Sequence, residues 1–168
     1  MSNTLIDQPL CVFMVGIPYS GKSTFIVRHK WLAQMPKVSL DKTVLRLAKG
    51  DYSKWAEVVE EAGRQMLAYQ NNLIAQKTSF VIDKTNVVSD ERVKLILQLK
   101  DAGYKVVAIA LEPPSAAELQ RRILSRPDKK IPMDVIESMR KNFLAGKERL
   151  REEFDAVVFV SKDGKYDV

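Results

Sequence analysis

The sequence is poor in residues that cross-link a chain, hold a metal or anchor it to a membrane. Its one cysteine, Cys11, lies in the apolar run "LCVFMV" (10–15), which predicts a buried side chain in a reducing compartment. Its one histidine, His29, stands beside Arg28 and Lys30, so we expect it at the surface, and no His and Cys have metal-ligand spacing. No apolar run approaches the roughly 20 residues that cross a bilayer, and the N-terminus "MSNTLIDQPL" lacks a secretion signal. We therefore expect a cytoplasmic protein without membrane contact.

Internal repeats and low-complexity tracts are also absent. The 168 residues are enough for one compact domain and too few for two comfortable ones, so we expect a single domain over 1–168. Hydrophobic residues make up 46% and charged residues 29%, as in ordinary soluble globular proteins. The net charge of +6 suits a polyanionic partner, although many basic proteins never bind nucleic acid. Function therefore has to be inferred from motifs.

Strand-like apolar runs alternate with longer stretches of helical periodicity. The expected strands are 10–15, 37–40, 79–83, 105–112 and 156–161. The expected helices are 22–34, 42–49, 53–77, 89–103, 115–126, 132–144 and 147–154, with Ser89 as a candidate cap. This alternation predicts an α/β fold with a parallel five-stranded sheet and helices on both faces. Ligands of such sheets bind at the carboxyl ends of the strands, where the motifs below lie.

"GIPYSGKS" (16–23) joins the first strand to the first helix and matches G-x-x-x-x-G-K-[ST], a strong signal in that context. Its glycines let backbone N–H groups surround phosphates, Lys22 reaches the β/γ-phosphates, and the Ser23 hydroxyl ligates Mg²⁺. The expected ATP-binding residues here are Gly16, Ser20, Gly21, Lys22, Ser23 and Thr24. Tyr19, at a variable position, either contacts an acceptor or is an exposed loop aromatic. The loop predicts a P-loop NTPase-type fold that binds ATP with Mg²⁺.

Asp41 follows the second strand and is the best candidate for a general base. Phosphorylation of a hydroxyl benefits from a carboxylate that orients the nucleophile and accepts its proton. The alternative role for Asp41 is to cap the helix expected at 42–49, and the two roles are compatible.

"DKTN" (83–86) ends the third strand. Asp83 either associates with magnesium or hydrogen-bonds the acceptor, with Thr85 alongside. The same four residues are also favourable turn formers, which is the structural alternative.

"LQRRILSRPDKK" (119–130) predicts a helical basic lid. Arginines beyond the fourth strand can fold over the donor phosphates and stabilise charge in the transition state. Arg122 and Arg126 are four residues apart and share a helix face, so we expect one or both to point inward. For Arg121, Lys129 and Lys130 we expect solvated side chains.

Four blocks of the sequence together resemble the polynucleotide 5′-hydroxyl kinase family, which includes the phage enzyme and the kinase domain of the animal repair enzyme. The blocks are "VFMVGIPYSGKSTF", "VSLDK", "VIDKTNVVSDERV" and "LQRRILSRPDKKIPMDVIESMRKNF", and the similarity covers 10–161. The resemblance implies that Lys22 and Ser23 contact ATP and Mg²⁺, Asp41 is the base on the 5′-hydroxyl, Asp83 and Thr85 lie near the acceptor, and Arg122 and Arg126 cover the donor phosphates. Lys22, Asp41 and Arg126 are then the expected catalytic residues.

The sequence departs from that family at the acceptor. The phage member has an arginine three residues after the base, where this chain has Val44, so Tyr19, Lys84 and Arg46 are the candidates to replace that contact. The phosphatase motif D-x-D-G-T that often follows in the family is absent, so we expect a kinase alone or a kinase fragment.

The leading hypothesis is ATP-dependent transfer of the γ-phosphate to the 5′-hydroxyl of a DNA or RNA end. One alternative is a kinase of a small hydroxylated molecule, such as a nucleoside, sugar or antibiotic. Another is a nucleotide-dependent binding module without turnover, which has no need of a base at Asp41.

Overall fold

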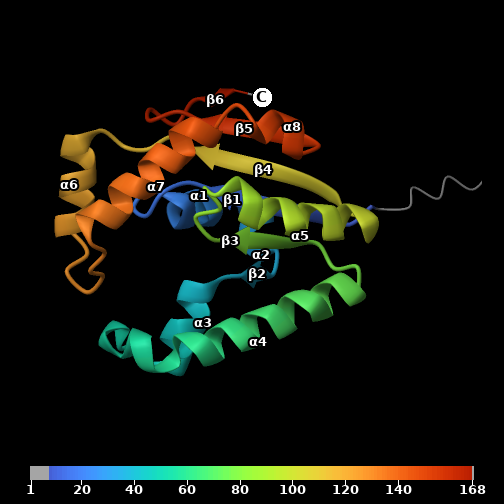
Figure 1. Cartoon of the computed structure of the whole chain (residues 1–168), viewed down its shortest axis with the longest axis horizontal. Helices are drawn as coiled ribbons and strands as arrows, with labels where there is room; N and C mark the ends of the chain where they lie inside the picture. Colours follow the sequence, from blue (N-terminus) through green and yellow to red (C-terminus); the bar gives the residue numbers. More distant parts are fainter. Residues whose placement is uncertain (1–7, 168) are drawn as a thin grey trace, which may run out of the picture.

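The central sheet has the predicted parallel strands in the order β2-β3-β1-β4-β5, with one more strand at its edge (Figure 1). The computed structural model describes residues 8–167, so most of the N-terminal segment in which we expected no secretion signal lies outside the described residues. The strands are β1 (Leu10–Val15), β2 (Lys37–Val38), β3 (Phe80–Asp83), β4 (Lys105–Leu111), β5 (Ala156–Val160) and β6 (Tyr166–Asp167). The extra strand, β6, pairs antiparallel with β5. It has only two residues, too few to show a periodicity in the sequence.

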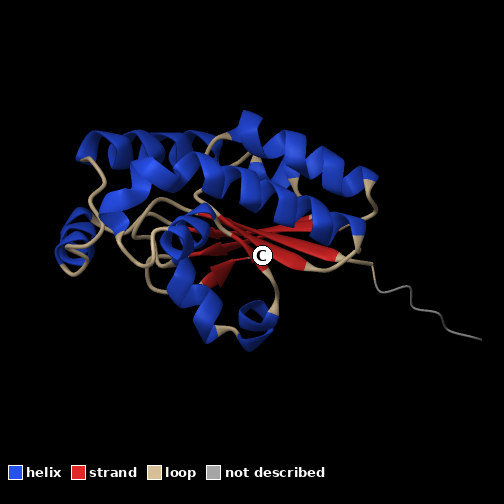
Figure 2. Cartoon of the chain, turned by 90° about the horizontal axis from the view of Figure 1, so that it is seen from below, coloured by secondary structure: helices blue, strands red, loops and turns tan. Residues whose placement is uncertain are grey.

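Helices cover both faces of the sheet, as Figure 2 shows. They are α1 (Lys22–Arg28), α2 (Lys30–Gln34), α3 (Leu40–Leu47), α4 (Trp55–Ala75), α5 (Ser89–Asp101), α6 (Ala116–Leu124), α7 (Met133–Gly146) and α8 (Leu150–Glu153), with a 3₁₀ turn η1 (Tyr52–Lys54). The α3–α4 pair lies at the β2 end of the sheet, whereas α6 lies at the left of the view and α7 runs from there toward β4 and β5 (Figure 1). Within residues 8–167, no helix is both long enough and apolar enough to span a bilayer.

The central strand β1 explains the position of the loop that follows it. Phe13 and Val15 point into the core that contains α5 and α7, whereas Val12 and Met14 point into the core that contains α1 and α2. Burial on both faces accounts for the continuous apolar run. Cys11 is fully buried, as predicted, and this burial raises the pKa of its thiol. The glycine-rich loop therefore begins at the rigid centre of the sheet.

The stretch expected as one helix over 22–34 breaks at His29, whose backbone is extended. The His29 Nδ1 lies 2.7 Å from the Phe25 carbonyl oxygen, and Nε2 lies 3.0 Å from the Tyr166 hydroxyl. A carbonyl only accepts, so Nδ1 carries the proton and Nε2 accepts from the tyrosine. His29 is half-buried at the surface, and its ring joins α1 to β6.

Helix α3 begins earlier than predicted, and this changes the role of Asp41. Strand β2 ends at Val38, and Ser39 is the N-cap, with its hydroxyl accepting from the Lys42 amide at 3.4 Å. Asp41 therefore lies in the first turn of α3 and does not cap the helix. Its carboxylate remains available for contacts outside the helix.

A buried ion pair fixes the loop that follows β3. Arg92 of α5 is 1% exposed and donates from Nε to Glu153 Oε2 at 2.5 Å, and its Nη1 donates to the Asn86 carbonyl at 2.9 Å. Asn86 in turn donates from Nδ2 to the Met14 carbonyl at 2.8 Å. The Ser89 hydroxyl binds Glu153 and caps no helix, so the capping predicted for Ser89 was wrong. The ion pair thus links α5 and α8 to the edge of the sheet where the motifs meet.

Candidate active site

The glycine-rich loop curls over the carboxyl end of β1. The Gly16 amide donates to the Thr85 carbonyl at 2.9 Å, and the Ser20 amide donates to the Ile17 carbonyl at 3.2 Å. A Cβ at Gly16 would stand 2.6 Å from Ser20 Oγ, so only glycine fits this turn without displacement of the serine. Gly21 has a φ of 98°, in the left-handed region that glycine adopts without strain. Both glycines of the motif are therefore required by the loop geometry.

Lys22 lies inside this loop. Its Nζ donates to the Gly16 and Ile17 carbonyls, both at 2.9 Å. Burial lowers the pKa of the Lys22 ammonium to about 8, with Asp83 opposing the shift, Lys129 adding to it and Asp41 opposing it. Burial removes part of the hydration of this ammonium. A negatively charged ligand beside it is therefore favoured, because its charge stabilises the ammonium in place of water.

Three hydroxyl groups of the loop and of the first turn of α1 complete the expected nucleotide site. The Ser20 hydroxyl is the one buried side-chain polar atom without a partner in the part of the chain that the structure describes, and it faces the turn at Gly16. Ser23 and Thr24 are exposed at the start of α1. A buried, unpaired hydroxyl in the loop that also binds the Lys22 ammonium fits a phosphate group.

The residues present also fit a magnesium ion, provided that phosphate and water supply most of its ligands. Asp83, whose side chain is 8% exposed, lies 3.7 Å from Lys42 Nζ and close enough to Lys22 to raise its pKa. Within residues 8–167, no cluster of three or more His, Cys, Asp or Glu side chains has the arrangement of a metal site. Mg²⁺ at phosphates is commonly bound by only one or two protein side chains, and Ser23 and Asp83 could supply these.

Tyr19, at the tip of the loop, is held in an uncommon conformation. Its φ of 64° lies in the left-handed region, which costs a non-glycine residue about 1 kcal/mol or more. Arg122 donates from Nη1 to the Tyr19 carbonyl at 2.7 Å, and the Tyr19 hydroxyl donates to the Lys129 carbonyl at 2.9 Å. The side chain is half-buried and contacts the lid, which excludes the alternative of an exposed loop aromatic.

The two lid arginines differ in what they contact. Arg122 belongs to α6 and joins that helix to the phosphate loop through the Tyr19 carbonyl, and within α6 it also donates from Nε to Glu118 Oε1 at 2.6 Å. The inward orientation expected for at least one lid arginine is therefore confirmed for Arg122. Arg126 is 53% exposed and pairs with Asp128 at 3.1 Å within the lid. Arg121 is exposed, as predicted, and forms an ion pair with Glu118.

Asp41 of α3 contacts Lys129 of the lid, which is distant from it in the sequence. Its Oδ2 lies 2.7 Å from Lys129 Nζ, and its side chain remains 48% exposed. Burial raises the pKa of the Tyr52 hydroxyl, and the nearby negative charge of Asp41 raises it further. Lys129 is only 18% exposed, so the prediction that it is solvated was wrong. Asp41 and Lys129 are 88 residues apart, and no local sequence pattern pairs them.

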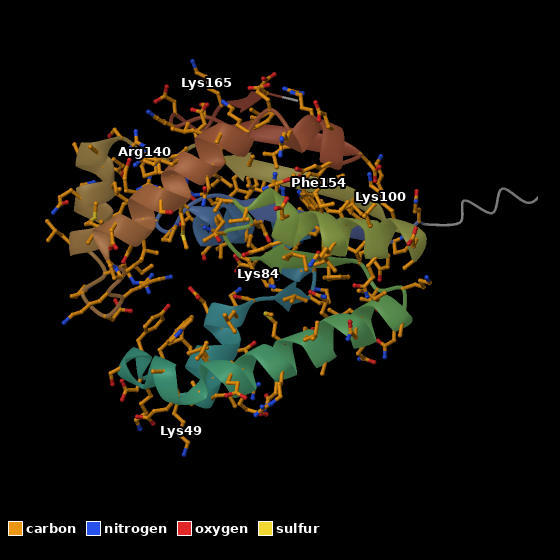
Figure 3. All side chains as sticks on the ribbon, viewed as in Figure 1. Lys49, Lys84, Lys100, Arg140, Phe154 and Lys165 are labelled. Atoms are coloured by element: carbon orange, nitrogen blue, oxygen red, sulfur yellow. The ribbon has the colours of Figure 1, made fainter. Side chains whose placement is uncertain are left out.

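Thr85 and Asp83 face different surroundings. Thr85 lines a groove of about 430 Å³ between the start of α5 and α7. Its carbonyl supports the phosphate loop, whereas Asp83 lies beside Lys42. Lys84, between them in sequence, is half-buried, and this burial lowers the pKa of its ammonium. In Figure 3, Lys84 lies on the side that faces α3 and α4.

The position that carries an arginine in the phage enzyme is inside the core here. Val44 is fully buried in α3. Arg46 donates to Gln65 of α4 at 2.6 Å on the exposed surface. Neither residue reaches toward Asp41 and Lys22, and this leaves Lys84 and Tyr19 as the remaining candidates for an acceptor contact.

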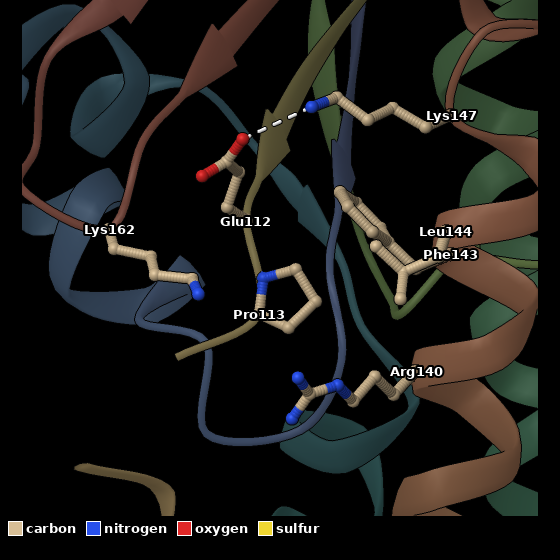
Figure 4. A pocket seen from close by; sticks show the side chains of 7 residues that line it. All are labelled: Glu112, Pro113, Arg140, Phe143, Leu144, Lys147 and Lys162. Atoms are coloured by element: carbon tan, nitrogen blue, oxygen red, sulfur yellow. Dashed lines mark hydrogen bonds and ion pairs between the residues drawn. The ribbon is translucent and has the colours of Figure 1, made fainter. Parts of the chain in front are cut away.

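A second cavity, of about 160 Å³, follows the carboxyl end of β4 (Figure 4). Its apolar lining is Pro113, Phe143 and Leu144, and its charged lining is Glu112, Arg140, Lys147 and Lys162. Glu112 pairs with Lys147 at 3.1 Å. The cavity begins one residue beyond Leu111, whose carbonyl would lie 3.4 Å from a Cβ at Gly16. It therefore adjoins the phosphate loop.

The sheet order, the loop at the end of β1 and the lid that contacts it define a P-loop nucleotide-binding protein. Residues 11–146 match the AAA_33 family, described as an AAA domain, and the chain belongs to that family. The chain is 28% identical over 137 residues to the L-seryl-tRNA(Sec) kinase of Methanococcus maripaludis. This match covers 80% of the chain and 52% of the relative, so the chain spans about half the length of that curated protein.

Solved structures of low sequence identity share the fold. One, of the PezAT toxin–antitoxin system of Streptococcus pneumoniae, gives a TM-score of 0.71 at 16% identity, over 96% of this chain and 72% of that one. Another, the AvrRxo1-ORF1:AvrRxo1-ORF2 complex with ATP, gives 0.76 at 20% identity, over 95% and 57%. A third, the Pnkp1/Rnl/Hen1 RNA repair complex, gives 0.65 at 22% identity, over 84% and 46%. At these identities the likeness establishes the α/β fold of P-loop proteins and no substrate.

Proposed function

We propose that this chain is a P-loop kinase domain that transfers the γ-phosphate of ATP to a hydroxyl carried by nucleic acid, with the 5′-hydroxyl of a DNA or RNA end as the leading acceptor. The observation that carries the proposal is the convergence of a donor and an acceptor group. Lys129 of the lid contacts both the phosphate loop and α3, because its carbonyl accepts from the Tyr19 hydroxyl at 2.9 Å and its Nζ lies 2.7 Å from Asp41 Oδ2.

The donor side of the proposed site is the phosphate loop. Gly16, Ser20, Gly21, Lys22 and Thr24 would hold the phosphates through backbone N–H groups, hydroxyls and the ammonium. Arg122 and Arg126 would neutralise charge from the lid. Ser23 and Asp83 would hold Mg²⁺, which offsets the charge of the phosphates when bound. The cavity beside Pro113 has both apolar and charged lining residues and adjoins the loop, which suits the nucleoside of the donor.

The acceptor side centres on Asp41. A half-exposed carboxylate at the start of α3 can accept a hydrogen bond from a substrate hydroxyl and then its proton. The hydroxyl oxygen forms a bond to the γ-phosphorus while the bond from that phosphorus to the bridging oxygen of ADP breaks. The proton passes to Asp41, and the Lys22 ammonium stabilises the negative charge that develops on the leaving oxygen.

Positive charge around Asp41 favours an anionic acceptor. Lys129 touches Asp41, Lys42 lies beside Asp83, and Lys84 follows Asp83 in the same loop. The name of the curated relative places its acceptor hydroxyl on a tRNA, which supports a nucleic-acid substrate. That name also favours a second candidate acceptor, the hydroxyl of a seryl group on a tRNA.

The substitution Asp41→Asn tests the assignment of the base. It keeps the size of the side chain and removes its proton affinity, so phosphate transfer should fall by roughly 100-fold or more. The ATP dissociation constant should stay within about twofold, because Asp41 does not belong to the phosphate loop. Asp101→Asn, at the exposed end of α5, is the matched control and should transfer at the wild-type rate. Retention of most activity by Asp41→Asn would exclude Asp41 as the base.

Salt dependence separates a polynucleotide acceptor from a small molecule. If three phosphates of a single strand are contacted, acceptor affinity should fall by roughly 20-fold between about 50 and about 200 mM salt. A neutral nucleoside or sugar should show almost no change. A flat salt dependence with an oligonucleotide acceptor would favour the small-molecule alternative.

A further inference from the structure

The lid turn at 126–129 carries a lysine that behaves unlike its neighbours. The Lys129 amide donates to the Arg126 carbonyl at 3.1 Å, and Arg126 and Asp128 pair across the same turn. Arg126 and Lys130 are exposed, whereas the Lys129 side chain is 18% exposed. A lysine gives up hydration and rotamer freedom when it is buried in this way, so a specific contact has to hold it there.

Lys129 meets three other elements of the fold. Its Nζ lies 2.7 Å from Asp41 Oδ2 on α3, and it stands over the Tyr52 ring at 5.8 Å from the centroid. Its backbone carbonyl accepts from the hydroxyl of Tyr19, which is 110 residues away at the tip of the phosphate loop. Lys129 therefore connects the phosphate loop, the lid and the proposed base directly.

The geometry of the contact leaves Asp41 able to react. The ammonium binds Oδ2, and the Asp41 side chain as a whole stays 48% exposed. A charge-assisted bond to one oxygen restricts rotation of the carboxylate without covering all of it. Tyr52 of η1, over whose ring the Lys129 ammonium lies, is held in turn by stacking on Trp55 of α4 at 5.2 Å between ring centroids.

We propose that Tyr19, Lys129 and Asp41 form a latch, in which Lys129 is a positioning residue that orients the base when the lid lies over the cleft. The inference rests on the proposed function, because it takes Asp41 as the base. Arg126 belongs to the same turn, so the lid position that brings Arg126 to the donor phosphates also brings Lys129 to Asp41. The base is then held in its reactive orientation only while the donor is covered, which limits misdirected transfer.

Amide hydrogen exchange of the lid, followed by mass spectrometry, tests the latch without any turnover. The variants are Lys129→Met, which removes the ammonium, Tyr19→Phe, which removes the hydroxyl, and Asp41→Asn, which removes the negative charge. Each should speed exchange in residues 124–131 by roughly tenfold, because each removes one bond of the latch. The adjacent, exposed Lys130 provides the control, and Lys130→Met should leave exchange unchanged. Wild-type exchange in all three variants would overturn the latch.

Steady-state kinetics tests whether the contact positions the base. Lys129→Met should lower kcat by roughly 10- to 100-fold with both substrates saturating and leave the ATP dissociation constant within about threefold. Lys129→Arg keeps the charge and should recover most of kcat, and a wild-type thermal midpoint in each variant would exclude misfolding. Faster exchange with an unchanged kcat would mean that the contact is only structural, and the positioning role would be wrong. Absence of transfer by the wild-type protein would instead refute the proposed function.

Discussion

Lys22 should make ATP binding depend on pH near its own pKa and above it. The phosphate loop buries its ammonium and lowers the pKa to about 8 in the free protein. Below that pH the side chain is charged, and above it the free protein progressively loses the charge that the phosphates need. Bound ATP favours the charged form, so binding above pH 8 must take up a proton.

The size of the effect follows from the pKa. With a pKa of about 8, roughly three quarters of Lys22 is charged at pH 7.5 and about 3% at pH 9.5. If only the charged form binds, the ATP dissociation constant should rise by roughly 25-fold, which corresponds to about 1.9 kcal/mol. Phosphate oxygens, with a second pKa of about 6, stay ionised throughout this range and contribute little.

Isothermal titration calorimetry at several pH values and constant ionic strength measures this directly. The binding heat should also vary with the ionisation enthalpy of the buffer near pH 8.5, because a proton is taken up. In Lys22→Arg the guanidinium stays charged, so the pH dependence should disappear even if affinity is lower. An ATP affinity of the wild type that is constant between pH 7.5 and 9.5 would refute the reasoning.

Two further predictions concern the loop and the core. Gly16→Ala places a Cβ 2.6 Å from Ser20 Oγ, so it should weaken ATP binding at least tenfold, as measured by calorimetry. Gly63→Ala, whose added Cβ would lie in open space on α4, is the control and should bind ATP normally. Equal ATP affinities of the two variants would contradict the packing described for the loop. Glu153→Ala removes the carboxylate that pairs with the buried Arg92, so it should lower the free energy of unfolding by about 3–5 kcal/mol and the thermal midpoint by roughly 6–20 °C. Glu152→Ala, at the exposed neighbouring position, is the control and should change the midpoint little. Similar midpoints for the two variants would show that the ion pair is dispensable.

The parts of this protein that follow from local pattern were predictable. The central strand β1 is a continuous apolar run because it is buried on both faces, and the phosphate loop has a fixed spacing because backbone N–H groups must converge. One or both of Arg122 and Arg126 were expected to face inward, and Arg122 contacts the loop at Tyr19. The strand and the loop depend on residues close together in the chain, whereas the Arg122 contact joins residues 103 positions apart.

The features that the sequence did not reveal depend on distant residues or on small backbone changes. Lys129 resembles any solvated lysine in a basic turn, and only the folded lid brings it to Asp41. Helix α3 begins earlier than the sequence predicted because Ser39 is its N-cap. Asp41 therefore lies within the first turn and does not cap the helix. The helix break at His29 comes from its bonds to Phe25 and Tyr166, the second of which lies at the far end of the chain.

Transfer of labelled γ-phosphate from ATP to a panel of acceptors tests the central claim most directly. The panel contains 5′-hydroxyl and 5′-phosphate oligonucleotides of DNA and RNA, a seryl-tRNA, nucleosides and shikimate, each offered with Mg²⁺ to the wild type and to Asp41→Asn. We predict labelling of 5′-hydroxyl ends by the wild type alone, with 5′-phosphate ends unlabelled. Labelling of the seryl-tRNA alone would select the second candidate. Labelling of only the small molecules, or of no acceptor, would contradict a kinase of nucleic-acid hydroxyls.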